Sequence, residues 1–215
     1  MKNHFQSKSL HLGKRERTRS ALIDSTIDVI ATKGFENASI KEIARNAGMA
    51  NGTFYNHFPT REHAVAEAVA AVIKEISEEI KTQVSGVVDG LDRIIISSDL
   101  MADRVLEDPA WGVLVVGALP HVGEIEVDVT ANMRREIEYA ASQGLVTLQC
   151  NWLLEAQILA VLSFGISVQL KQGYSKQTRA QTYEAVLRLL GCSLSDSKKR
   201  VERILTQRET EKNIQ

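Results

Sequence analysis

Apolar residues recur at the period of an α-helix along nearly the whole chain, which has 215 residues. The first stripe lies in a helix predicted to begin at Lys14 and to stop at Gly34, and its inner face carries Leu22, Ile23, Thr26, Ile27 and Ile30. Similar stripes follow and are interrupted at Gly86, Asp108-Pro109, Pro120, Gly144, Gly173 and Gly191. The pattern predicts nine or ten helices and no sheet, and therefore an all-α fold.

Two short helices are predicted directly after the first long one. Ser39 is the expected N-cap of the first, and Glu42, three residues later, completes a capping box. Gly48 stands where the chain must turn sharply, because glycine tolerates a positive φ angle. The second short helix is predicted from about Asn51 to His57 and is followed by a proline. Two short helices around a glycine turn are typical of a helix-turn-helix.

The second short helix has two chemically different faces. Phe54 and Phe58 are four residues apart and suit an apolar core. The other positions carry amide, hydroxyl and imidazole groups, on Asn51, Thr53, Tyr55, Asn56 and His57. Side chains of this kind reach base edges and phosphates from the major groove of DNA. The sequence therefore predicts a helix that reads DNA.

Charge is distributed unevenly along the chain. Residues 1–62 carry 10 Lys and Arg against 6 Asp and Glu, whereas residues 63–215 carry 16 against 21. A basic N-terminal part joined to an acidic remainder favours contact with a polyanion through the N-terminal part alone.

Several other classes of protein are not expected. Cys150 and Cys192 lie far apart and form no CxxC pair, which favours a reduced, cytoplasmic protein without a zinc site. The motifs GxSxG, HExxH and GxGxxG do not occur, so we expect neither an enzyme nor a cofactor or metal. The apolar stretch 153–170 contains five polar residues and is expected to be a buried or interface helix rather than a membrane span.

Residues Arg19 to Glu62 resemble the DNA-binding domain of TetR-family transcriptional regulators. The resemblance rests on Gly34-Phe35, on SIKEIA at residues 39–44, and on GTFYNHF at residues 52–58. It covers a fifth of the chain and implies an N-terminal three-helix helix-turn-helix domain joined to a C-terminal helical domain for ligand binding and dimerisation. The remainder resembles the family only in being helical.

The resemblance also implies individual roles at the DNA. Thr53 would begin the recognition helix, Asn56 would read a base such as adenine, and Tyr55 and His57 would hold phosphates. The full set of expected DNA-binding residues is Ser39, Lys41, Asn51, Gly52, Thr53, Tyr55, Asn56, His57 and Arg61. Ser39 and Arg61 would contact phosphates, Lys41 would face the groove or the backbone, and Gly52 would permit close approach. Family members often carry Lys or Arg where Asn51 stands, so one contact is altered here.

Each of these roles has a simpler alternative. Tyr55 can be a core aromatic residue, and His57 can be a solvated surface histidine. Lys41 can be an ordinary solubilising charge. The DNA backbone can be contacted by Arg15, Arg17 and Arg19, or these residues belong to a plain surface.

The expected organisation has four parts. Residues 1–13 form a mobile arm, 14–62 the DNA-binding domain, 63–192 the regulatory and dimerisation domain, and 193–215 a helical tail. Because one helix-turn-helix reads few base pairs, specificity calls for a homodimer on a palindromic double-stranded operator. The predicted interface uses helices at about 151–172 and 175–190, with a purely internal core as the alternative.

A small-molecule effector is expected between Gly86 and Leu148. Trp111, Leu114, His121 and Met133 are the candidate ligand-binding residues, although each can equally belong to a solid core. The leading functional hypothesis is a repressor that its ligand releases from the operator. An activator or ligand-independent regulator remains open, and a small-molecule carrier or an enzyme is a more distant alternative.

Overall fold

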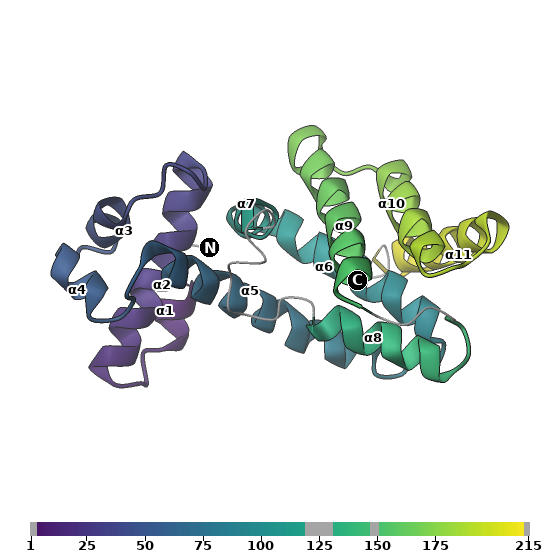
Figure 1. Ribbon diagram of the computed structural model, residues 1–215, viewed down its shortest axis with the longest axis horizontal. Coiled ribbons are helices and arrows are strands. Elements are labelled where there is room, and N and C mark those ends of the chain that lie inside the picture. Colours follow the sequence, from purple (N-terminus) through teal and green to yellow (C-terminus); the bar gives the residue numbers. More distant parts are fainter. Residues whose placement is uncertain (1–3, 119–130, 147–150, 213–215) are drawn as a thin grey trace. The chain divides into compact units, whose positions relative to one another are not determined.

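The computed structural model describes residues 4–118, 131–146 and 151–212, and these are helical with no strand (Figure 1). The prediction of an all-α fold is confirmed. The helices are α1 (His4–Lys8), α2 (Lys14–Lys33), α3 (Ile40–Asn46), α4 (Asn51–Tyr55), α5 (Arg61–Val84), α6 (Gly90–Glu107), α7 (Pro109–Ala118), α8 (Ala131–Ser142), α9 (Trp152–Gln172), α10 (Lys176–Leu189) and α11 (Leu194–Lys212).

The chain divides into two compact units whose limits differ from the predicted domains. The first comprises the described residues of 1–75 and 107–129, and the second those of 76–106 and 130–215. No boundary falls at residue 62, because α5 continues without a break and its first part packs in the first unit. Helix α7, expected in the regulatory domain, also belongs to the first unit, where it lies against α2.

The N-terminal segment, expected to be a mobile arm, contains α1 packed on α2. The backbone N–H groups of Phe5 and Gln6 donate to the Asp24 carboxylate at 3.0 and 2.8 Å. Burial raises the pKa of Asp24 above its usual value, although both hydrogen bonds act to lower it. The Phe5 ring stacks on the ring of Trp111, with centroids 6.1 Å apart. Residues 4–8 are therefore held to the first unit by specific contacts.

The second unit is a helical bundle in which α10 packs against both α9 and α11. Its core joins apolar residues of α6, α8, α9, α10 and α11. Val201, Ile204 and Leu205 of α11 are buried in this core. The segment expected to be a tail is thus an integral part of the bundle.

Candidate nucleic-acid interface

The turn between α3 and α4 forms as the sequence predicts. The Ser39 side chain accepts from the backbone N–H of Glu42, and the Glu42 carboxylate accepts from the backbone N–H of Ser39. Gly48 has φ of +69°, a backbone conformation that other residues rarely adopt. The buried Ser25 hydroxyl of α2 donates to the carbonyl oxygen of Ile43 at 2.6 Å. This contact fixes α3 on α2.

The apolar face of α4 and the turn after it is fully buried. Phe54 and Phe58 are 0% and 1% exposed, and their ring centroids lie 5.5 Å apart. Tyr55 is 57% exposed and meets Phe54 only through an edge contact. Of the two interpretations of Tyr55, the structure therefore excludes the core aromatic.

The opposite face of α4 is open and polar. Asn51, Gly52 and Asn56 are exposed, while Thr53 and His57 are half-buried. Gly52 and Asn56 are four residues apart and share a helix face. A Cβ atom on Gly52 would meet nothing within 4 Å, so the protein's own packing does not require glycine there. The polar face can accommodate an external partner at close range.

Arg19 of α2 holds the turn that follows α4. Its guanidinium donates to the carbonyl oxygen of His57 at 3.2 Å and lies over the Phe58 ring, 4.7 Å from the centroid. It also pairs with Glu67 of α5 at 2.7 Å. The Arg19 side chain is 37% exposed, and its contacts within the unit give it a structural role that the sequence did not predict.

His57 is electrostatically disfavoured as a cation. Its pKa is lowered below the usual value by partial burial and by the positive charges of Arg15 and Arg19, and Glu16 opposes this only weakly. The imidazole is consequently neutral at pH 7 in the free protein.

Arg61, expected to contact a phosphate, binds the chain itself. Its guanidinium donates to the carbonyl oxygens of Phe35 and Ala38 at 2.9 and 3.3 Å and lies 5.7 Å from the centroid of the Phe35 ring. These contacts tie the start of α5 to the loop before α3. No local pattern reveals them, because the partners lie 23 and 26 residues away.

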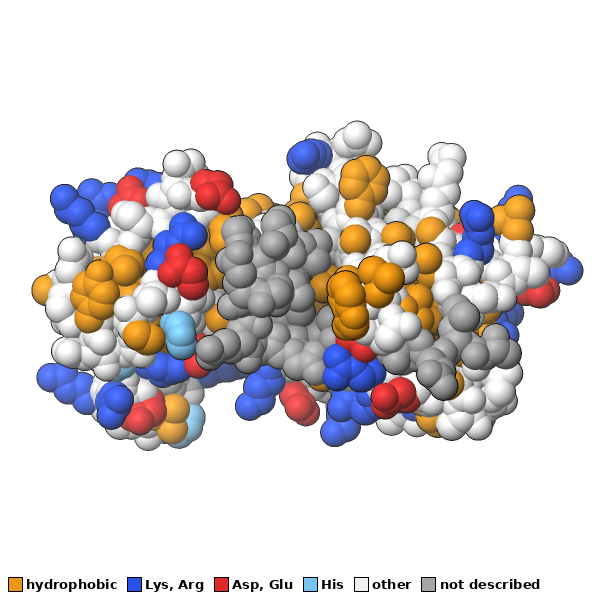
Figure 2. Space-filling view, in the orientation of Figure 1, with side chains coloured by type: hydrophobic (Ala, Val, Ile, Leu, Met, Phe, Trp, Pro, Cys, Tyr) orange, Lys and Arg blue, Asp and Glu red, His pale blue; other side chains and the backbone are white. Residues whose placement is uncertain are grey.

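Exposed basic side chains lie around the helix-turn-helix, at Lys14, Arg15, Arg17, Lys33, Lys41 and Arg45. Figure 2 shows Lys and Arg side chains on the surface near α3 and α4. Lys33 is paired with Glu42, which lowers the pKa of that carboxyl, and is less available to an outside anion. Ser39 and Lys41 are exposed, as DNA contact requires.

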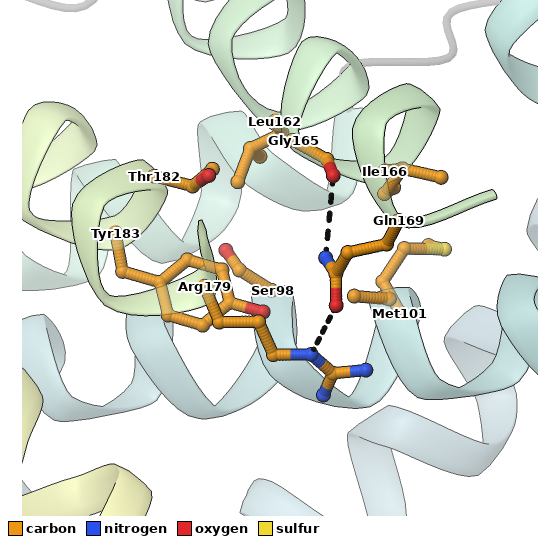
Figure 3. A pocket seen from close by; sticks show the side chains of 10 residues that line it. Ser98, Met101, Leu162, Gly165, Ile166, Gln169, Arg179, Thr182 and Tyr183 are labelled. Atoms are coloured by element: carbon orange, nitrogen blue, oxygen red, sulfur yellow. Dashed lines mark hydrogen bonds between the residues drawn. The ribbon is translucent and has the colours of Figure 1, made fainter. Parts of the chain in front are cut away.

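The expected ligand residues that the structure describes belong to two different units. Trp111 and Leu114 of α7 are fully buried in the first unit, and Met133 of α8 packs against the core of the second. His121 lies outside the described residues. The structure instead has a small cavity within the second unit, of about 30 Å³, between α6, α9 and α10 (Figure 3). It is lined by Ser98, Met101, Ala102, Leu162, Gly165, Ile166, Gln169, Arg179, Thr182 and Tyr183.

The cavity wall contains buried charge. Arg179 and Asp99 are each 2% exposed and joined at 2.8 Å. Gln169 of the mainly apolar α9 is buried at the cavity wall. Gln169 is one of the five polar residues of the apolar stretch 153–170, and the sequence pattern predicts neither its burial nor that of the arginine on α10. Among the described residues, no group of three or more His, Cys, Asp and Glu could hold a metal ion.

Helix α9 is the one described helix that is long and apolar enough to cross a membrane, with a mean hydropathy of 1.7 over its most apolar 18 residues. A helix in the core or at an interface of a protein can have the same length and composition as a membrane-spanning helix. The buried Glu155 of α9 pairs with Arg134 of α8 at 2.6 Å, as in a helix packed within protein. These contacts favour the predicted buried or interface helix.

Comparison with known sequences identifies the N-terminal part. Residues 22–68 match the family described as bacterial regulatory proteins of the tetR family. An uncharacterized HTH-type transcriptional regulator of Haemophilus influenzae is 40% identical over 57 residues, which are 26% of this chain and 28% of that protein. The HTH-type transcriptional regulator YvdT of Bacillus subtilis is 30% identical over 95 residues, 43% of this chain and 47% of that protein. The chain thus matches less than half the length of these relatives.

The similarity to solved structures covers most of the chain. RolR in complex with the ligand resorcinol gives a TM-score of 0.69 at 24% identity, covering 88% of this chain and 95% of that one. FadR of Bacillus subtilis in complex with stearoyl-CoA gives 0.62 at 15% identity, covering 79% and 96%. Residues 22–68 thus match the helix-turn-helix of the tetR family of bacterial regulatory proteins, and the fold of most of the chain is similar to that of RolR and FadR.

Proposed function

We propose that this protein is a cytoplasmic transcriptional repressor that binds a palindromic operator as a homodimer and is released by a small molecule. The observation that carries the DNA-binding role is the exposed polar face of α4, mounted on the buried Phe54 and Phe58. Exposed basic residues around it supply attraction to phosphates. The TetR-family match at residues 22–68 supports the same role.

An exposed apolar surface on α9 supports dimerisation. Trp152 and Phe164 are 77% and 73% exposed, and Leu153 is 51% exposed. Only 39% of the most apolar 18 residues of α9 are buried within one chain. Figure 2 shows hydrophobic side chains on the surface over α9. Such a surface is stabilised by a second copy, and two copies related by a twofold axis match a palindrome.

The cavity between α6, α9 and α10 is the candidate effector site. The similar structures of RolR and FadR contain resorcinol and stearoyl-CoA, respectively, which supports ligand control here. A ligand changes the affinity for the operator only to the extent that it binds the two conformations of the protein differently. Activation in place of repression would use the same binding sites.

The decisive experiment is selection of bound sequences from random DNA by the full-length protein. We expect an enriched palindrome with half-sites about one helical turn apart, and an affinity that falls steeply with salt. A small-molecule carrier without a working helix-turn-helix would give no enrichment and no salt-dependent binding, which would overturn the proposal. Repression or activation is then decided with a reporter gene behind the selected operator.

Asn56 and Tyr55 should affect DNA binding in different ways. Asn56→Ala is expected to cost about 1 to 3 kcal/mol of operator binding and to relax preference at one base position, because an amide reads a base edge. Tyr55→Phe removes only the exposed hydroxyl and should weaken binding to all sequences alike. Competition binding with operators mutated at each position measures both effects. Uniform loss in Asn56→Ala would remove it as the base-reading residue.

His57 should make operator binding depend on pH. Its pKa is lowered in the free protein, and a nearby phosphate would raise it in the complex, so binding takes up a proton. Operator affinity should therefore increase as the pH falls from about 7.5 toward 6. The slope should disappear in His57→Gln, and a slope that persists in this variant would assign the proton to another group.

Gly52→Ala should raise the free energy of unfolding and lower the affinity for the operator. Because a Cβ atom there meets only open space and alanine favours helix, the variant should gain about 0.5 to 1 kcal/mol in unfolding free energy. The added methyl group lies on the face of Asn56 and should weaken operator binding. Gly86→Ala, also in open space but outside α4, is the matched control and should bind normally. Normal operator affinity in Gly52→Ala would show that DNA does not approach this face closely.

A further inference from the structure

The turn between α1 and α2, residues 9–13, exposes two leucine side chains. Leu10 is 67% exposed and Leu12 is 44% exposed, and His11 between them also faces solvent. Figure 1 shows this leucine turn at the lower end of α2, and Figure 2 shows hydrophobic, basic and histidine side chains at this end of the first unit. Two leucines form a surface far smaller than the roughly 800 Å² that each partner of a stable protein complex buries. The leucine turn therefore suits a narrow groove better than the surface of another protein.

The leucine turn is already ordered in the free protein. Ser9 is 3% exposed, and its hydroxyl donates to the carbonyl oxygen of Gln6 at 2.8 Å. The backbone N–H of Leu12 donates to the carbonyl oxygen of Ser9 at 2.9 Å. The preceding helix, α1, is fixed to α2 through the Asp24 carboxylate. Because the turn does not have to be ordered on binding, its leucines can contact a partner at a low entropic cost.

The basic side chains that follow the leucine turn have no internal partner. Elsewhere in the first unit a lysine is paired, as Lys8 is with Glu75. Within the described part of the chain, neither an ion pair nor a hydrogen bond engages the exposed side chains of Lys14, Arg15 and Arg17. Glu16 is the only acidic residue between positions 8 and 19. An apolar tip beside free positive charges fits a polyanion with an apolar interior, and the stacked bases of DNA provide one.

The leucine turn lies close to the end of the candidate DNA-reading surface. The Arg19 guanidinium donates to the carbonyl oxygen of His57 at 3.2 Å. Burial and then the positive charge of Arg15 lower the pKa of His57, so Arg15 also lies near it. From Arg19 back to Gly13 the distance along the helix axis is about 9 Å. In B-DNA a minor groove about 6 Å wide borders the major groove, which is about 12 Å wide. With α4 in the major groove, the leucine turn is within reach of the neighbouring minor groove.

We propose that the leucine turn inserts into the minor groove beside each operator half-site, with Lys14, Arg15 and Arg17 against the phosphates that border this groove. The inference rests on the proposed function, because it requires α4 in the adjacent major groove. Leucine side chains wedged between base pairs unstack them, and pyrimidine–purine steps such as TA unstack most readily. The operator therefore extends beyond the bases that α4 contacts, and each flank contains such a step.

The test compares operators that differ only in their flanks. A TA step is moved, one position at a time, through the bases outside each half-site, and a stiff A-tract is the reference. The adenine of the step is replaced by 2-aminopurine, whose fluorescence rises when it is unstacked. At one position we expect the full-length protein to bind at least about fivefold more tightly than to the A-tract operator, with a rise in fluorescence. Equal affinity at every position, or unchanged fluorescence, would overturn the proposal.

Variants of the two leucines assign the contact. Leu10→Ala with Leu12→Ala should abolish the preference for the TA step and the rise in fluorescence, while binding to the A-tract operator stays the same. Leu194→Ala is the matched control, because Leu194 is 62% exposed on α11, and it should keep the preference. If circular dichroism shows that the double variant is unfolded, Leu10→Ala alone must lower the preference. A preference that survives the leucine variants would contradict the assignment.

The basic side chains are tested through the salt dependence of operator binding. Arg15→Gln with Arg17→Gln should reduce the slope of log affinity against log salt by about 2, because each phosphate contact contributes about 0.9. The leucine variants should leave this slope unchanged, since an apolar contact releases no counterion. Lys74→Gln, at an exposed position of α5, is the control and should also leave it unchanged. An unchanged slope in the arginine variant would show that these side chains do not contact phosphates.

The outcomes distinguish this inference from the proposed function. If the protein binds no DNA, both fail. If it binds the selected operator but neither the flanks nor the leucines affect binding, only this inference fails. Vesicles of phosphatidylglycerol offer another anionic surface with an apolar interior. Vesicle binding that the leucine variants lose, without any effect of these variants on operator binding, would assign the turn to a membrane surface and overturn the inference.

Discussion

Replacing Asp99 by alanine is expected to lower the free energy of unfolding by about 3 to 5 kcal/mol, because it leaves a buried arginine without its main partner. Asp99 accepts from Arg179, Tyr183 and Arg208, at 2.8, 3.1 and 2.5 Å. Asp103 also contacts Arg179 but lies nearer the surface, so it offsets only part of the loss. Urea denaturation followed by circular dichroism measures the effect.

The matched control for Asp99→Ala is Glu209→Ala. Glu209 pairs with Lys176 between side chains that are 39% and 44% exposed and also accepts from the Tyr174 hydroxyl at 3.3 Å, and removal of such a partly exposed pair costs about 1 kcal/mol or less. If both variants lose the same stability, the buried network has no special role in the second unit.

The pH dependence of Asp99→Ala provides a second check. Burial acts to raise the pKa of Asp99, but the hydrogen bond from Arg208 and the charges of Arg179 and Arg208 hold it below its usual value. The carboxylate therefore contributes stability above the unfolded pKa of about 3.9, and this is lost as the pH falls through the lower folded pKa. The difference between the wild type and Asp99→Ala should be full at pH 7 and shrink in strong acid.

Gly90→Ala should destabilise the second unit by about 3 kcal/mol, at the upper end of overpacking effects. An added Cβ atom would lie 2.6 Å from the Cα atom and 2.9 Å from the backbone nitrogen of Ala140 in α8. Backbone atoms cannot rotate away, so α6 and α8 must separate. The separation would also strain the hydrogen bond from the Gly90 N–H to the Gln143 side chain, now 2.8 Å.

The control for Gly90→Ala is Gly86→Ala, which lies four residues earlier and meets nothing within 4 Å. It should leave the unfolding midpoint unchanged or slightly raised. Thermal unfolding of both variants distinguishes the close contact from a general effect of replacing glycine. Equal midpoints would show that α8 yields at Ala140 without cost.

The helix-turn-helix was predictable because its determinants are local. The capping box joins Ser39 and Glu42, and the turn depends on Gly48 alone. The two faces of α4 follow from the helical period, which buries Phe54 and Phe58 and exposes Asn56. Sequence patterns within a few residues therefore specified both the elements and the candidate DNA-binding surface.

The organisation of the regulatory part was not predictable in the same way. The sequence left Trp111 as either a ligand-binding or a core residue, and the structure buries it and stacks it on Phe5, more than a hundred residues earlier in the chain. Arg61 was expected to face phosphate but binds backbone carbonyls of a loop 23 and 26 residues away. An apolar or charged side chain has the same local pattern in either role, so only its partners distinguish them.

The sequence by itself determined an all-α chain and a helix-turn-helix between residues 39 and 58, because helical periodicity and capping act over a single turn. The tertiary structure alone decided which unit α7 joins, and where the cavity lies. It also decided that Arg179 pairs with Asp99, 80 positions away. Such pairings depend on how helices pack, and a buried ion pair has no sequence signal until both partners are placed in the same low-dielectric core.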